Sequence, residues 1–184
     1  MVGSPLNVSP GCSQNLRMSS TATPKNRPPR SLKQRAISRL LIVVLFTTLG
    51  LFVISFTSQP PSNLGVVNGR LAKCPDTPNC VSTQSDDPEQ RMEPIDYQGT
   101  RDEMKQRIQQ TITNSFSRAR LVAESPDYLH YEFTSLVFRF VDDVEFFLDD
   151  ESKQVHFRSA SRSGYSDLGV NRRRMQSIAN RLQP

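Results

Sequence analysis

The apolar residues of this chain first gather in one uncharged run, residues 40–58. A helix needs about 20 mostly apolar residues to cross a bilayer, with a lower limit of roughly 17. The polar residues in the run are mainly serines and threonines, whose hydroxyls can bond a backbone carbonyl one turn back. The pattern therefore predicts a single transmembrane helix over residues 40–58.

Three other interpretations of this run stay open. A buried core helix would rarely be so long without a charge. A cleaved signal peptide normally has an apolar region of about 7–15 residues, and no small-x-small cleavage site follows Phe56. The acid-free segment before the run, rich in Ser and Thr, also resembles an organelle transit peptide.

After the run, proline and glycine predict a linker over residues 59–73 and an irregular arm over the next 26 residues, 74–99. Thr100 can cap a helix that ends near Asn114. The four-residue spacing of Met104, Ile108 and Ile112 gives that helix one apolar stripe.

Beyond this helix the apolar spacing changes to two, which is typical of strands. The predicted strands are residues 120–124, 128–135, 137–149 and 154–161. A last helix covers about 171–182, and Met175, Ile178 and Leu182 form its apolar stripe. The order helix, four antiparallel strands, helix predicts an α+β domain over residues 74–184, with both helices on one face of the sheet.

The turn near Ser152 sets the register of the last two strands. It places Phe146 opposite Phe157, Leu148 opposite Val155 and Glu145 opposite Arg158, because a slip of one residue would turn every side chain to the wrong face. In this register Asp142 falls on the apolar face near Ser161, so its carboxylate must be hydrogen-bonded or paired, or else it holds its proton.

Charge separates the two parts of the chain. Residues 1–39 contain seven basic and no acidic residues, and the remainder contains 23 − 7 = 16 basic and 18 acidic residues. Since basic residues beside a membrane segment stay in the cytoplasm, we expect a disordered cytoplasmic tail over 1–39 and a domain in the periplasm or a thylakoid lumen. The net charge of +5 thus reflects topology and predicts no nucleic-acid partner.

Two cysteines bracket a short loop with two prolines. Outside the cytoplasm thiols oxidise, so Cys74 and Cys80 are predicted to form a disulfide that acts as a structural staple.

Several polar residues near the last hairpin are candidates for chemistry. Gly164 and Gly169 allow the loop after the last strand to fold back. Four arginines could then converge near the start of the last helix: Arg158, Arg162, Arg172 and Arg173. A helix start with arginines nearby favours the binding of an anion. Alternatively, the arginines pair with the nearby carboxylates, and Asp142 secures the loop. The ligand-binding candidates are Asp142, Asp143, Glu145, His156, Arg158, Arg162, Tyr165, Ser166, Asp167, Asn171 and Arg172.

No motif predicts a catalytic residue, a metal or a cofactor. The sequence has no HExxH, CxxCH or Gly-rich phosphate loop. A triad of Ser159, His156 and Asp167 can be written down, but many chains of this size allow such a set.

Three blocks of sequence resemble the family catalogued as domain of unknown function 1499. They are Leu71-Ala-Lys-Cys-Pro-Asp-Thr-Pro-Asn-Cys-Val-Ser82, Phe138-Arg-Phe-Val-Asp-Asp-Val-Glu-Phe146 and Arg158-Ser-Ala-Ser-Arg-Ser-Gly-Tyr-Ser-Asp-Leu-Gly-Val-Asn-Arg172. The resemblance covers about residues 71–182. It implies the limits of the domain and no activity.

Three hypotheses of function follow. The first is a membrane-anchored, non-enzymatic module that binds a partner protein or a small anionic or lipid-like ligand. The second is an enzyme that uses the acidic residues and His156 on the sheet. The third is a purely structural protein of the envelope or lumen.

Overall fold

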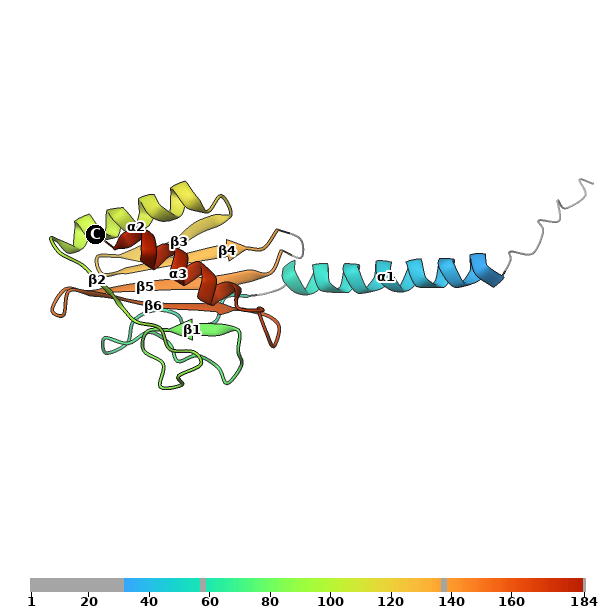
Figure 1. The fold of residues 1–184 in the computed structure, drawn as a ribbon, viewed down its shortest axis with the longest axis horizontal. Coiled ribbons are helices and arrows are strands. Elements are labelled where there is room, and N and C mark those ends of the chain that lie inside the picture. The colour runs from blue at the N-terminus through green and yellow to red at the C-terminus, as the bar shows by residue number, and fades with distance from the viewer. Residues whose placement is uncertain (1–31, 57–58, 137–138, 184) are drawn as a thin grey trace, which may run out of the picture. The chain divides into compact units, whose positions relative to one another are not determined.

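The computed structural model describes residues 32–56, 59–136 and 139–183, with only the backbone described for residues 51–56. Its elements follow in the order α1 (Leu32–Phe56), β1 (Cys80–Ser82), β2 (Ile95–Asp96), α2 (Arg101–Ser115), β3 (Ala119–Ser125), β4 (Tyr128–Thr134), β5 (Val141–Asp149), β6 (Gln154–Ser161) and α3 (Val170–Leu182) (Figure 1).

Our prediction of a transmembrane helix over residues 40–58 is wrong. Within the described part of the chain, no helix combines the length and the apolar character that a bilayer crossing requires. Helix α1 begins at Leu32, so Lys33, Arg35 and Arg39 lie within the helix instead of preceding it. Residues 57 and 58, and residues 1–31 of the predicted tail, lie outside the described residues.

The folded domain is of the α+β class, as predicted, but its sheet has six strands where we predicted four. The strands run antiparallel in the order β1-β6-β5-β4-β3, and β2 also pairs with β6. The two additional strands come from the arm that we predicted to be irregular. They have 3 and 2 residues, too few to produce a recognisable alternation.

Helix α2 begins at a capping box. The hydroxyl of Thr100 accepts the backbone N–H of Glu103, and the Glu103 carboxylate accepts the N–H of Thr100 at 2.8 Å. Each bond satisfies a donor that the helix itself leaves free.

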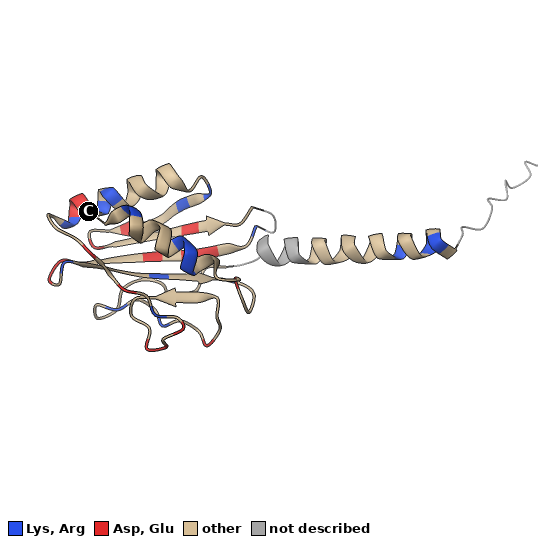
Figure 2. Ribbon diagram, viewed as in Figure 1, with Lys and Arg blue, Asp and Glu red and all other residues tan. Residues whose placement is uncertain are grey.

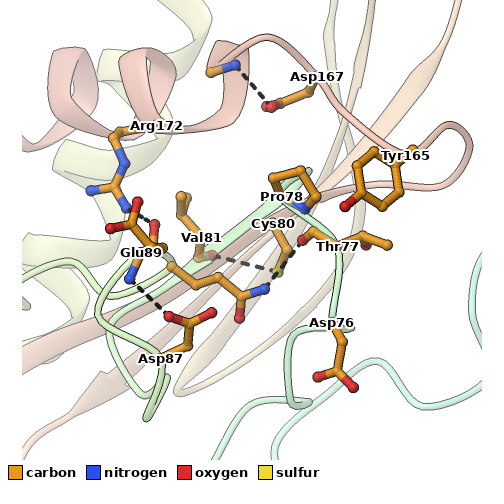
Figure 3. A pocket seen from close by; sticks show the side chains of 12 residues that line it. Asp76, Thr77, Pro78, Cys80, Val81, Asp87, Glu89, Tyr165, Asp167 and Arg172 are labelled. Carbon is orange, nitrogen blue, oxygen red and sulfur yellow. Dashed lines mark hydrogen bonds between the residues drawn. The ribbon is translucent and has the colours of Figure 1, made fainter.

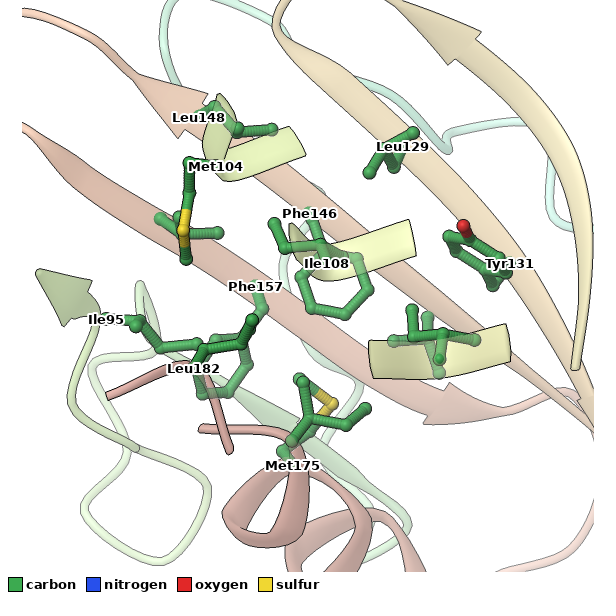
Figure 4. Packing of buried hydrophobic residues seen from close by; sticks show 14 of the residues in the cluster. Ile95, Met104, Ile108, Leu129, Tyr131, Phe146, Leu148, Phe157, Met175 and Leu182 are labelled. Carbon is green, nitrogen blue, oxygen red and sulfur yellow. The ribbon is translucent and has the colours of Figure 1, made fainter. Parts of the chain in front are cut away.

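Both helices cover one face of the sheet, as predicted (Figure 1). The α2 stripe packs with the α3 stripe over the apolar side chains of β4, β5 and β6 (Figure 4). Phe146 and Phe157, at the centre of this core, are fully buried. The predicted register is confirmed, since Phe146 pairs with Phe157, Leu148 with Val155 and Glu145 with Arg158.

One strand begins later than predicted. We expected a strand from residue 137, but β5 starts at Val141, and residues 137 and 138 lie outside the described residues. Arg139 has a φ of 54°, a left-handed conformation that a strand does not contain.

Part of the predicted linker contacts the domain. The N–H of Gly65 donates to the Glu145 carboxylate at 2.8 Å, and the N–H of Leu71 donates to the side-chain oxygen of Gln84 at 2.8 Å. The Leu71 side chain is buried.

Candidate functional site

The predicted site residues are divided between the two faces of the sheet and one loop. Successive side chains of a strand point to opposite faces, so Asp142 of β5 faces the helices, and Asp143 and Glu145 face away from them. We call the side away from the helices the back face. Figure 2 shows Asp and Glu, in red, within the central strands as well as on the loops.

On the back face, Asp143 is the centre of a buried ionic network. Its Oδ1 lies 2.8 Å from Nε2 of His130 and 2.6 Å from Nη2 of Arg162, and its Oδ2 accepts Nε of Arg162 at 2.8 Å. Arg162 also pairs with Glu132. Such a bidentate, charge-assisted pair is stronger than hydrogen bonds between neutral groups.

The charges of this network stabilise one another. Burial by itself would raise the pKa of Asp143, but hydrogen bonds from Arg162 and His130 outweigh it and hold the pKa below its usual value. Burial would also raise the pKa of Glu132, but hydrogen bonds from Arg162 and Arg120 outweigh this effect and lower the pKa. The bond to Asp143 raises the pKa of Arg162. Asp143, Glu132 and Arg162 therefore stay charged near neutral pH.

Glu145 organises the neighbouring part of the back face. Its carboxylate accepts the Tyr128 hydroxyl and the Gly65 N–H, each at 2.8 Å, and Nη1 of Arg158 at 3.2 Å. Burial, together with the charge of Glu145, raises the pKa of the Tyr128 hydroxyl. Among the described residues, Nε of Arg158 is buried and has no hydrogen-bond partner.

On the helix face, Asp142 joins β5 to α3. Its carboxylate accepts Ser161 Oγ at 2.6 Å and Nη2 of Arg174 at 2.5 Å. Arg174 also donates to Oδ1 of the buried Asn171 at 2.7 Å, and its guanidinium lies over the Phe133 ring. Asp142 therefore secures α3 and not the loop after β6. Arg174 was not among the predicted site residues, although it lies one helical turn from Asn171.

The four arginines expected near the start of α3 do not converge. Arg158 and Arg162 pair with carboxylates on the back face. Arg172 donates to two backbone carbonyls of the 89–91 turn, and Arg173 donates to the carbonyl of Leu168.

The start of α3 is satisfied by a carboxylate of its own loop. Asp167 accepts the N–H groups of Gly169 at 3.0 Å and Asn171 at 2.6 Å. The anion-binding position that we expected at this helix end is thus filled by Asp167. Ser166 accepts the N–H of Leu168 at 3.2 Å and caps the same turn.

The hypothetical triad does not form. Ser159 donates to Asn171 on the helix face, whereas His156 bonds the Thr83 hydroxyl at 3.2 Å and stacks on Phe147 on the back face. Burial lowers the pKa of His156.

A cavity of about 420 Å³ lies where three segments meet (Figure 3). They are the disulfide loop (residues 74–80), the 87–90 turn and the loop before α3 (residues 162–169). In this view Arg172 and Glu89 lie on the left, Asp87 below them, Tyr165 on the right and Asp167 at the top. The predicted candidates Tyr165, Asp167 and Arg172 therefore share one cavity.

The walls of the cavity are tied together. Gln90 Nε2 donates to the carbonyls of Pro75 at 2.7 Å and Thr77 at 3.2 Å, which joins the turn to the disulfide loop. Asn79 Nδ2 donates to the Gly164 carbonyl at 2.6 Å, which joins the disulfide loop to the loop before α3. The Cys74–Cys80 disulfide, which we predicted from the sequence, closes the disulfide loop.

The cavity is acidic. Its lining contains the carboxylates Asp76, Asp87, Glu89 and Asp167 and the single guanidinium of Arg172, a formal charge of −4 + 1 = −3. The guanidinium is already bound to carbonyls, and Asp167 is bound to α3.

Sequence reasoning missed the contribution of the 87–90 turn to this cavity. Asp87, Glu89 and Gln90 belong to a stretch that we interpreted only as irregular. A signal was present, since acidic residues surround Pro88 soon after the cysteine pair.

Comparison with known proteins identifies a family. The sequence model of the family described as "Protein of unknown function (DUF1499)" matches residues 70–182, which confirms the predicted resemblance. No curated protein and no solved structure matches the chain. The matched range includes the three segments that line the cavity and the whole sheet.

Proposed function

This chain belongs to the DUF1499 family of proteins of unknown function, and we propose that its domain is a binding module for a positively charged ligand. The observation that carries the proposal is the cavity between the disulfide loop, the 87–90 turn and the loop before α3. Its volume of about 420 Å³ falls in the range of known small-ligand sites, about 300–1,000 Å³.

The charge of the cavity favours a cation over the anion that the sequence suggested. Arg158 and Arg162 pair with carboxylates on the back face. Arg172 and Arg173 donate to backbone carbonyls, and Asp167 occupies the start of α3. Within the described part of the chain, the side chains of Asp76 and Glu89 make no hydrogen bond or ion pair, so both can accept bonds from a ligand. The exposed ring of Tyr165 adds a surface on which a cation can stack.

The lining supports binding more than covalent chemistry. A nucleophile needs an adjacent base to activate it. Cys80, which lines the cavity, is held in the disulfide, and neither histidine lines the cavity. The disulfide also supports an oxidising compartment as the place where the domain works.

The test is an NMR titration of the ¹⁵N-labelled full chain with L-arginine amide, with sodium acetate at equal ionic strength as the comparison. We expect saturable shifts of amides in residues 76–81, 87–90 and 165–172 with arginine amide only. Asp76→Asn combined with Glu89→Gln should raise the Kd about tenfold, since two exposed charge pairs each contribute up to about 1 kcal/mol.

The matched control removes two exposed carboxylates outside this cavity, Glu93→Gln with Glu151→Gln, and should leave the Kd unchanged. The proposal fails if arginine amide gives no saturable shifts, if acetate gives the same shifts, or if the control weakens binding as much as the cavity variant.

A further inference from the structure

The loop before α3 and the first residue of α3 present apolar side chains to solvent beside the acidic cavity. Tyr165 is 74% exposed, Leu168 84% and Val170 42%, all within six residues. Tyr165 lines the cavity, and Leu168 lies between two residues that line it, Asp167 and Gly169. We call these three side chains the apolar rim.

The backbone at the exposed Leu168 adopts a conformation that costs conformational free energy. Leu168 has a φ of 54°, in the left-handed region that residues with a Cβ adopt reluctantly. The hydroxyl of Ser166 accepts the Leu168 N–H, and the carbonyl of Leu168 accepts Nη1 of Arg173 at 2.9 Å. Strained residues of this kind persist where the surrounding bonds determine them, and they concentrate at binding sites.

We propose that the cation bound in the cavity is a lysine or arginine side chain of a partner polypeptide, and that an apolar residue beside it packs on the apolar rim. This inference rests on the proposed function. A small cation would occupy the cavity and leave the rim in water, whereas a polypeptide segment covers both. The partner is therefore a protein with an exposed segment in which a basic and an apolar residue are adjacent.

The charge beside the rim selects a protein over a membrane. An apolar loop can also enter lipid, but anionic headgroups attract basic residues. The residues around this rim are mainly acidic, Asp87, Glu89 and Asp167. The guanidiniums of Arg172 and Arg173, which also lie near the rim, are bound to backbone carbonyls.

Three capped tripeptides test the inference with the full chain, by calorimetry: acetyl-Arg-Leu-Phe amide, acetyl-Arg-Gly-Gly amide and acetyl-Gly-Leu-Phe amide. We expect the first to bind at least tenfold more tightly than either of the others. Leu168→Asn removes the apolar side chain and suits the left-handed backbone, because Asn tolerates this conformation. This substitution should raise the Kd of acetyl-Arg-Leu-Phe amide by a factor at least fivefold larger than the factor by which it raises the Kd of arginine amide.

The matched control is Val67→Asn, which replaces another exposed apolar residue, 70% exposed and outside the cavity lining. It should leave the affinity of every peptide unchanged. A thermal unfolding midpoint of Leu168→Asn at or above that of the wild type shows that the fold is intact.

The outcomes separate the two proposals. If arginine amide binds but acetyl-Arg-Leu-Phe amide binds no more tightly than acetyl-Arg-Gly-Gly amide, the polypeptide inference is overturned and the binding function stands. If neither arginine amide nor any peptide binds, both are overturned. Binding to vesicles of phosphatidylglycerol and phosphatidylcholine that Leu168→Asn abolishes would also overturn the inference, in favour of a membrane.

Discussion

At the scale of single residues, the back face of the sheet is occupied by charges that satisfy one another. Asp143 and Glu145 are 1% and 0% exposed, yet each carboxylate accepts three hydrogen bonds. Breaking such a buried pair is costly because the partner charge stays buried. These residues, which the sequence suggested as ligand contacts, are better explained as part of the fold.

Asp143→Asn is expected to lower the free energy of unfolding by about 3 kcal/mol, because Arg162 would lose a charged partner inside the protein. Urea denaturation of the full chain measures this change. The variant should bind arginine amide as the wild type does, since Asp143 does not line the cavity.

The matched control is Glu124→Gln on β3. Its carboxylate, 48% exposed, lies 3.5 Å from Lys105, and a pair of this kind contributes less than about 1 kcal/mol. Equal losses of stability in the two variants would contradict a special role for the buried network.

Some residue contacts were predictable and others were not. The alternation of β5 and β6, together with the short turn near Ser152 that joins them, places Glu145 opposite Arg158. The partner of Asp142 was not predictable in the same way, because the orientation of Arg174 depends on how the loop with Leu168 and Gly169 enters α3.

At the scale of elements, long and periodic segments were predicted well. The prediction for β6 matches at both ends, and the stripes of α2 and α3 are buried as their spacing indicated. The failures occur where the local pattern is short or the backbone is unusual. β1 and β2 pair with distant residues of β6, and the left-handed backbone of Arg139 interrupts the alternation from which we predicted an earlier start of β5.

The start of α2 makes a prediction that belongs to one element. Thr100→Ala removes the hydroxyl that accepts the Glu103 N–H and should lower the free energy of unfolding by about 1 kcal/mol. The urea midpoint should fall while the m-value stays the same. Thr100→Ser keeps the acceptor and should stay close to the wild type, so a loss as large in Thr100→Ser would contradict the capping explanation.

At the scale of the whole molecule, the cavity is a product of tertiary structure. Its lining comes from segments around residues 77, 88 and 168, which are joined by Gln90, Asn79 and Arg172. None of these bonds leaves a periodic signal in the sequence. The sequence therefore indicated Tyr165, Asp167 and Arg172 as candidates but not the acidic residues of the other two segments, on which we base the proposal of a cationic ligand.

The disulfide is the covalent link in this arrangement, and its removal tests how far the fold depends on it. The two cysteines are 6 residues apart, and closing so short a loop stabilises a protein by about 2 kcal/mol in the chain-entropy description. In a Cys12→Ser background, Cys74→Ser with Cys80→Ser should lower the free energy of unfolding by about that amount. Dithiothreitol should produce the same loss in the parent protein and none in the double variant. Alkylation should show that both thiols of the treated parent protein are reduced. If its urea midpoint has not moved although both thiols are reduced, the stabilising role is contradicted.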